Sequence, residues 1–128
     1  MIEFKNVTYQ FPDGTRALDR LNLKIGRGER VGIIGPNGSG KSSFALHING
    51  VLKPSSGSVI VNNLNPNIET DNQKLKQMVG MVFQNPDNQL VTMTVEREIA
   101  FSLENQNTQL DEMSRRVHEI LDFFDLAR

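Results

Sequence analysis

The eight residues from Gly35 to Ser42 have the types and the spacing needed to bind a phosphate chain. They read Gly-Pro-Asn-Gly-Ser-Gly-Lys-Ser, which fits the P-loop pattern of a glycine, four residues and then Gly-Lys-Ser. Glycines let a backbone curl tightly and bring its N–H groups close to an anion. Lys41 adds a positive charge for the terminal phosphates, and the Ser42 hydroxyl can ligate Mg²⁺. The stretch therefore predicts a binding site for the phosphates of a nucleotide.

The segments on either side of this loop support the prediction. Residues 30–34, Arg-Val-Gly-Ile-Ile, form a short apolar run that is typical of a buried parallel strand. Residues 43–49 can continue as a helix whose N-terminal dipole points at the phosphates, and Gly50 is placed to end it. A chance glycine-rich turn is the alternative, and the strand-loop-helix context argues against it. The predicted nucleotide-binding residues are Gly35, Pro36, Asn37, Gly38, Ser39, Gly40, Lys41, Ser42 and Ser43.

The composition is that of an ordinary globular domain without a strong electrostatic bias. The 128 residues are 38% apolar and 23% charged, with a formal net charge of −1. No global field favours nucleic acid or an anionic membrane as a partner. The sequence has no cysteine, no apolar run near the roughly 20 residues that span a bilayer, and no signal-peptide layout at its start. We therefore expect a cytoplasmic protein.

The remaining pattern predicts strands and helices around the loop. Alternating β-formers predict strands over residues 2–11 and 17–25, paired as an antiparallel hairpin, with further strands at 58–61 and 79–83. Helices are predicted over residues 71–78, 94–103 and 110–125, with Thr94 as an N-cap and a capping box from Thr108 to Asp111. The predicted fold class is α/β: a P-loop NTPase core sheet with an N-terminal antiparallel β subdomain and flanking helices.

Four features in this order resemble the N-terminal part of an ATP-binding-cassette (ABC) ATPase. They are the aromatic-bearing first strand, the glycine-rich loop, Gln84 after an apolar strand, and the helical stretch that follows. Residues 82–89, Val-Phe-Gln-Asn-Pro-Asp-Asn-Gln, and residues 92–96, Thr-Met-Thr-Val-Glu, are similar to the energy-coupling-factor transporter ATPases of the cobalt- and vitamin-uptake branch. The resemblance covers essentially all of residues 1–128.

The resemblance implies roles for two residues outside the loop. Phe11 matches the aromatic residue that stacks on adenine in this family, a contact that gains from apolar burial. Tyr9 is two residues away and is the rival for this role, and a third interpretation is that both rings only pack the hairpin. Gln84 matches the Q-loop glutamine, whose amide oxygen suits Mg²⁺ and whose side chain can orient a water. Lys41 and Gln84 are then the candidate catalytic residues, and Ser42 and Gln84 the candidate metal ligands.

The resemblance also implies a function, cofactors and partners. The family hydrolyses ATP with Mg²⁺ to power uptake of a vitamin or a metal ion across a membrane. The implied partners are a second ATPase subunit (identical or different), a transmembrane coupling subunit and a substrate-capture subunit, which would hold the protein at the cytoplasmic face of the membrane. Residues 85–103 match the region that contacts the membrane partner. There Leu90, Val91 and Met93 form either an apolar docking edge or ordinary core.

Three later motifs of the family are not found in residues 1–128. They are the Leu-Ser-Gly-Gly-Gln signature, the apolar Walker B strand ending in Asp-Glu, and the switch histidine. We therefore expect residues 1–128 to be the N-terminal portion of one ABC-type ATP-binding domain, which binds nucleotide without efficient hydrolysis by itself. A soluble ABC-type ATPase not tied to a transporter is the alternative function, and a non-hydrolysing nucleotide-binding module is another. His47 and His118 have no metal or acid–base pattern and are expected to be structural or solvated.

Overall fold

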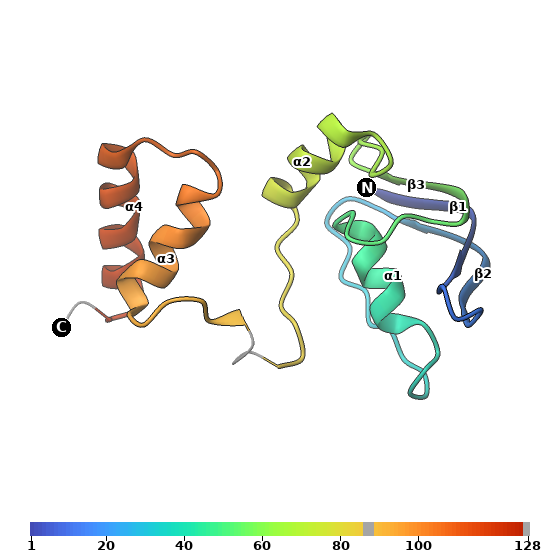
Figure 1. Ribbon diagram of the computed structural model, residues 1–128. Coiled ribbons are helices and arrows are strands. Elements are labelled where there is room, and N and C mark those ends of the chain that lie inside the picture. The colour runs from blue at the N-terminus through green and yellow to red at the C-terminus, as the bar shows by residue number, and fades with distance from the viewer. Residues whose placement is uncertain (86–88, 127–128) are drawn as a thin grey trace. The chain divides into compact units, whose positions relative to one another are not determined.

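The computed structural model describes residues 1–85 and 89–126, in two compact units that divide between residues 81 and 82 (Figure 1). The first unit, Met1–Met81, contains the strands β1 (Ile2–Gln10), β2 (Arg16–Ile25) and β3 (Ser56–Val61) and the helices α1 (Lys41–Ile48) and α2 (Glu69–Met78). The second unit contains the helices α3 (Val95–Glu104) and α4 (Leu110–Phe123). Each unit has its own buried apolar cluster. Within the described ranges, no helix is both long and apolar enough to cross a membrane.

The sheet of the first unit is antiparallel, with β1 in the middle of the order β2-β1-β3. Phe4 of β1 lies opposite Leu23 of β2 on one side and Val59 of β3 on the other. The register slips between Phe4 and Val7, where Asn6 adopts a φ of 48°. This bulge brings both Phe4 and Val7 into the core although they are three positions apart. The predicted antiparallel hairpin and the predicted strand near residues 58–61 are confirmed.

Helix α1, which follows the phosphate loop, is held against this sheet by its buried side chains. The Phe44 ring stacks on the Phe4 ring of β1 with centroids 4.7 Å apart. The amide of Asn72 on α2 donates hydrogen bonds of 2.9 Å to the carbonyls of Gly50 and Pro66, which ties α2 to the end of α1. These contacts fix the helix that carries the loop. The fully buried cluster comprises Phe4, Val7, Leu18, Phe44, Val59, Val61 and Leu75.

The second unit is a pair of helices that lie side by side (Figure 1). Its buried residues are Leu103, Met113 and Val117, at the spacing that predicted an amphipathic helix. The Thr94 hydroxyl accepts a hydrogen bond of 3.3 Å from the Arg97 amide, which confirms Thr94 as the N-cap of α3.

The predicted capping box from Thr108 to Asp111 is wrong. The N-cap of α4 is Gln109, and no side chain caps this helix. The Thr108 amide instead donates to the Leu103 carbonyl at 3.1 Å, so this residue closes the end of α3. Because α4 begins at Leu110 with Gln109 as its N-cap, Thr108 lies one position too early for its hydroxyl to cap the helix.

Two segments predicted as buried strands, residues 30–34 and 79–83, do not form strands in the described structure. Ile34 is 98% exposed and Val82 is 90% exposed. A strand is stable only beside a hydrogen-bonded neighbour, and the described sheet pairs only β1, β2 and β3 with one another. The apolar character of both segments was therefore identified correctly, but the described residues do not supply the parallel strands that would bury them.

Candidate functional site

The candidate phosphate-binding loop runs from Gly35 directly into α1, which begins at Lys41. Gly38 and Gly40 have φ values of 81° and 88°, the left-handed conformation that residues with a Cβ rarely adopt. A Cβ on Gly40 would lie 2.3 Å from the Ala17 carbonyl oxygen of β2. Only glycine therefore lets the loop approach β2 this closely, which explains why the pattern needs glycine at this position.

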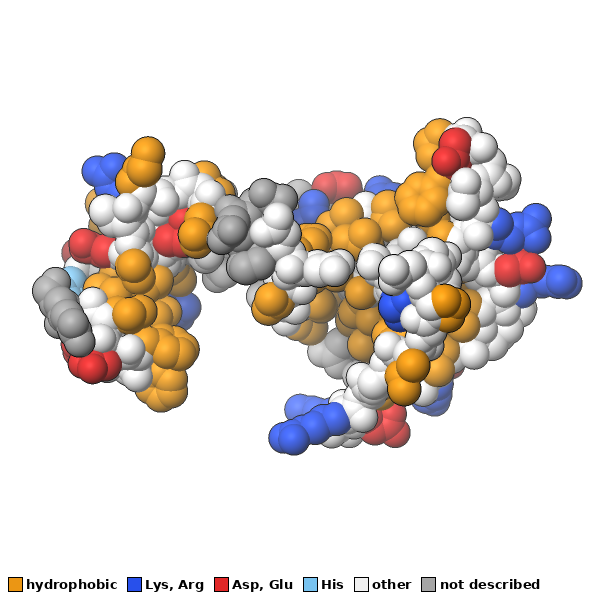
Figure 2. Space-filling model, turned by 90° about the horizontal axis from the view of Figure 1, so that it is seen from below, with side chains coloured by type: hydrophobic (Ala, Val, Ile, Leu, Met, Phe, Trp, Pro, Cys, Tyr) orange, Lys and Arg blue, Asp and Glu red, His pale blue; other side chains and the backbone are white. Residues whose placement is uncertain are grey.

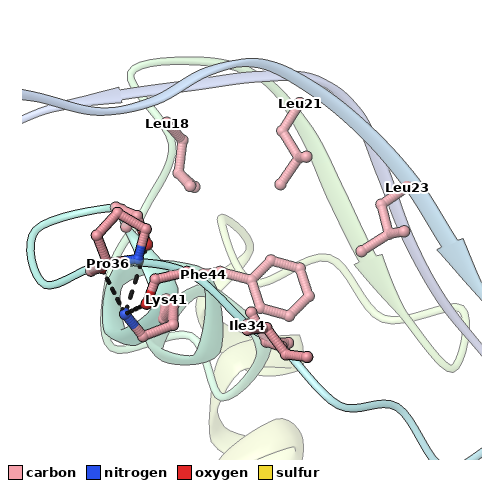
Figure 3. A pocket seen from close by; sticks show the side chains of 11 residues that line it. Leu18, Leu21, Leu23, Ile34, Pro36, Lys41 and Phe44 are labelled. Atoms are coloured by element: carbon pink, nitrogen blue, oxygen red, sulfur yellow. Dashed lines mark hydrogen bonds between the residues drawn. The ribbon is translucent and has the colours of Figure 1, made fainter.

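The Lys41 ammonium folds back over the loop (Figure 3). Its Nζ donates hydrogen bonds to the carbonyl oxygens of Gly35 at 2.8 Å and Pro36 at 2.7 Å. The Ser39 amide donates to the Pro36 carbonyl at 3.3 Å. The lysine thus bridges the start of the loop to its end and places a positive charge at the mouth of the curl.

The N-terminus of α1 differs from those of the other described helices. Its N-cap is Gly40, which offers no side-chain oxygen, and its first turn contains no acidic residue. By contrast, α2, α3 and α4 each have two acidic residues in the first turn. An uncapped helix start with free positive dipole charge, next to a lysine and an exposed Ser42 hydroxyl, suits a phosphate group together with a cation.

A pocket of about 350 Å³ lies beside the loop, but its walls do not suit a triphosphate. Leu18, Leu21 and Leu23 of β2 point across the opening toward Phe44 and Ile34 (Figure 3). Such an apolar lining favours apolar side chains rather than anions. This pocket is the space next to residues 30–34, and the phosphate-binding features lie at its rim, at Gly35 to Lys41.

Of the two candidate adenine-stacking residues, Phe11 is the more accessible. Its side chain is 37% exposed, just beyond the end of β1. The Tyr9 ring is partly buried and makes edge contacts with Phe11 on one side and His47 of α1 on the other. Tyr9 thus packs between the hairpin and α1, which leaves Phe11 as the ring with surface to offer a base.

The two histidines have the structural and solvated roles predicted for them. His47 is fully buried in α1, and its Nδ1 lies 2.6 Å from the Ser43 carbonyl oxygen. Burial lowers the pKa of the His47 ring, although the hydrogen bond to Ser43 opposes this. His118 is exposed on α4 and hydrogen-bonds the Ser114 carbonyl. Among the described residues, no three acidic or histidine side chains gather as a metal site.

Gln84 lies in the second unit, in an exposed bend before the helices. Its side chain is therefore open to solvent, whereas the phosphate loop belongs to the first unit. Of the adjoining motif, residues 86–88 lie outside the described residues.

The apolar residues that follow are exposed rather than buried, at 66% for Leu90, 65% for Val91 and 100% for Met93. Figure 2 shows hydrophobic side chains gathered on the surface of the α3–α4 unit. Within the described residues these three side chains form an exposed apolar edge, and its use in docking stays a prediction.

Glu98 of α3 holds this edge in place, a role that the sequence alone did not reveal. Its carboxylate accepts hydrogen bonds from the Thr92 amide at 2.8 Å, the Thr92 hydroxyl at 2.9 Å and the Val91 amide at 3.0 Å. The Thr92 amide contributes most to lowering the pKa of the Glu98 carboxyl. The signal in the sequence was a threonine followed six residues later by an acid inside the first turn of a helix.

The matches to known proteins cover nearly the whole chain. The family model described as ABC transporter matches residues 18–128. The chain belongs to the ABC transporter family. Energy-coupling factor transporter ATP-binding proteins are among its relatives: EcfA of Methanothermobacter thermautotrophicus is 48% identical over 95% of this chain, and EcfA of Methanosarcina acetivorans is 46% identical over 100% of it. These matches confirm the resemblance found in the sequence.

The chain spans less than half the length of these relatives: 40% of the Methanothermobacter EcfA and 47% of the Methanosarcina EcfA. Solved structures agree on the fold. A structure of cbiO1 from Clostridium perfringens, described as part of the ABC transporter complex cbiONQ, has a TM-score of 0.77 at 38% identity and covers 94% of this chain and 49% of its own. A dimeric ATP-binding cassette, MJ0796, bound to ADP and Pi has a TM-score of 0.76 at 32% identity, with 95% and 56% covered. The predicted fold class, a truncated ABC ATPase domain, is confirmed.

Proposed function

We propose that residues 1–128 form the N-terminal portion of the ATP-binding subunit of an energy-coupling-factor ABC transporter. In this proposal the whole protein hydrolyses ATP to drive uptake of a vitamin or a metal ion. The observation that carries the proposal is the phosphate loop, in which Lys41 and the uncapped start of α1 converge beside Gly40. The EcfA relatives support the choice of this branch of the family.

The proposed division of labour follows from the chemistry of each group. The amides of residues 35–43 hold the phosphates, and Lys41 exchanges its two carbonyl partners for phosphate oxygens. Phe11 stacks on adenine. The Ser42 hydroxyl and the Gln84 amide oxygen are hard oxygen ligands of the kind that Mg²⁺ prefers, and both side chains are exposed. Bound Mg²⁺ would neutralise charge on the phosphates.

Hydrolysis is assigned to the full-length protein rather than to residues 1–128. The transfer of a γ-phosphoryl group needs a metal ion, a positioned water and charge stabilisation together. The motifs that supply a carboxylate and a signature in this family are not found in the sequence. We therefore expect residues 1–128 to bind ATP with negligible turnover, and robust turnover by these residues would contradict this assignment.

Partners are proposed from the apolar edge and from the relatives. Leu90, Val91 and Met93 would dock on a transmembrane coupling subunit, which places the protein at the cytoplasmic face of the membrane. A second ATPase subunit, identical or different, would complete the ATP site, and a substrate-capture subunit would select the cargo. Two structural neighbours support such an assembly, since cbiO1 is described as part of a transporter complex and MJ0796 as a dimer.

A pair of measurements on the full-length protein tests the catalytic part of the proposal. Gln84→Ala should reduce ATP turnover in the assembled transporter more than it reduces ATP affinity. Gln73→Ala, which alters an exposed glutamine of α2, is the matched control and should change neither. If Gln84→Ala reduced binding and turnover equally, a purely structural role for Gln84 would follow.

Co-purification tests the transporter part. Met93→Glu places a charge on the apolar edge and should abolish co-purification with a membrane subunit while ATP affinity stays unchanged. Leu110→Glu, at the start of α4 where the side chain is 80% exposed, is the matched control. A wild-type protein that binds ATP but never co-purifies with a membrane subunit would instead be a soluble ABC-type ATPase.

A further inference from the structure

A row of three rings connects the tip of the first hairpin to the helix that carries the phosphate loop. The Phe11 and Tyr9 rings lie 5.0 Å apart between centroids, with their planes at 79°. The Tyr9 and His47 rings lie 4.9 Å apart, with their planes at 78°. Edge-to-face pairs of this kind have a preferred geometry, so the position of one ring restricts the next.

The inner end of the row is fixed on α1. His47 has no exposed surface, and its ring also contacts the Phe4 ring edge-on at 6.5 Å. Because the Ser43 carbonyl can only accept, the Nδ1 that lies 2.6 Å away must carry the proton and donate it. Ser43 is in the first turn of α1, two residues after Lys41. The ring of His47 is therefore locked to the turn that begins the phosphate site.

The other nitrogen of His47 supports a packing role. Its Nε2 is buried and has no hydrogen-bond partner among the described residues. A buried histidine that uses only one nitrogen serves here as a ring, not as a relay of protons. Tyr9 is partly buried on top of this ring, whereas Phe11 keeps 37% of its surface exposed.

We propose that Tyr9 and His47 are positioning residues that set the Phe11 ring at a fixed distance from the phosphate loop, and so give the site its preference for an adenine nucleotide over a bare polyphosphate. The inference rests on the proposed function, in which Phe11 stacks on adenine and residues 35–43 hold the phosphates. The row of rings thus links the position of the ring that holds the base to the position of the loop that holds the phosphates. Loss of a middle ring leaves Phe11 mobile and lowers affinity only for ligands that carry a base.

The test compares Mg-ATP with inorganic tripolyphosphate as ligands of the full-length protein, by isothermal titration calorimetry. Tyr9→Leu removes both ring contacts and should weaken ATP binding about two- to tenfold, the range expected for the loss of one aromatic pair, with tripolyphosphate affinity unchanged. Tyr9→Phe keeps the ring and should bind ATP like the wild type. Phe11→Leu should show the same selective loss as Tyr9→Leu.

A double-mutant cycle then tests whether Tyr9 acts through His47. If the two residues act in series, the double variant Tyr9→Leu/His47→Leu should bind ATP no more weakly than the single variant that has the larger loss of affinity. Thermal unfolding of each variant identifies any that fails to fold, and the Tyr9 variants alone decide the question if His47→Leu is one of these.

Three results would overturn the inference. They are equal ATP affinity in Tyr9→Leu and Tyr9→Phe, parallel loss of ATP and tripolyphosphate binding, and a selective loss in Tyr9→Leu with none in Phe11→Leu. The last result would mean that Tyr9 itself stacks on adenine. Failure of the wild type to bind tripolyphosphate would instead count against the proposed phosphate site. The proposed function and the positioning role of Tyr9 and His47 therefore fail in different ways.

Discussion

Gly40→Ala should destabilise the protein much more than Gly38→Ala, although both glycines have a φ near +80° to +90°. Gly38 has φ 81°, and a Cβ placed on it would have no atom within 4 Å, whereas a Cβ on Gly40 would lie 2.3 Å from the Ala17 carbonyl oxygen. Both substitutions incur the left-handed strain of about 1–2 kcal/mol. Only Gly40→Ala must also push the loop away from β2, and forcing an extra carbon into a packed site costs about 1–3 kcal/mol more.

Urea unfolding of the two variants, without nucleotide, measures this difference directly. We expect the free energy of unfolding to fall by about 1–2 kcal/mol for Gly38→Ala and by about 2–5 kcal/mol for Gly40→Ala, from the sum of the two effects. Tripolyphosphate affinity should fall in Gly40→Ala because the start of α1 moves with the loop. Equal destabilisation by the two variants would refute the argument that contact with β2 fixes the loop.

Three further predictions concern charged or titratable groups. Lys41→Ala should weaken Mg-ATP binding by about 1.5–3 kcal/mol, roughly ten- to a hundredfold, measured by calorimetry, because it removes a charge-assisted phosphate contact. Because burial lowers the pKa of His47 in the folded state, its full contribution to stability is present above the ordinary value of 6.5. The free energy of unfolding should therefore fall below that pH, by at most about 1.4 kcal/mol per pH unit, in urea titrations from pH 7.5 to 5. The pKa of Glu98 is also lowered, so its carboxylate should keep its hydrogen bonds to Val91 and Thr92 below the ordinary value of 4.5. These bonds should be lost as the pH falls through the lowered pKa, and amide hydrogen exchange measures this loss.

Each of these predictions has a clear contrary result. Unchanged ATP affinity in Lys41→Ala would argue against the phosphate site. A His47→Phe variant keeps a ring but cannot titrate, so it should lose the fall in stability near pH 6, and an identical pH profile would assign that fall to another group. In Glu98→Gln the Val91 and Thr92 amides should exchange faster at pH 7, and unaltered exchange would show that the carboxylate does not hold the loop.

The sequence predicted the parts of the fold that depend on local pattern. The antiparallel hairpin, the helix after the phosphate loop and the N-cap at Thr94 follow from alternation, glycine placement and capping chemistry, which act within a few residues. The capping box at Thr108 failed because α4 begins one residue later than the pattern implies, and a sequence pattern does not fix a helix boundary to a single residue.

The predictions for residues 30–34 and 79–83 failed for a different reason. An apolar run indicates that a segment prefers burial, but the tertiary fold decides which neighbours bury it. The role of Glu98 was missed for a related reason, since it depends on hydrogen-bonding partners that folding brings near. The glycine-rich loop and the helix that follows it could be predicted because their pattern is contained in consecutive residues, and the binding of phosphate there stays a prediction.

The exposure of Ile34 has a practical consequence for work with these 128 residues. Residues 31–34 are exposed, uncharged and outside every described strand, and such a stretch is a template on which a second molecule can lay the same stretch. Concentrated samples should therefore scatter light and form mixed oligomers, more so as salt screens the charges that keep molecules apart.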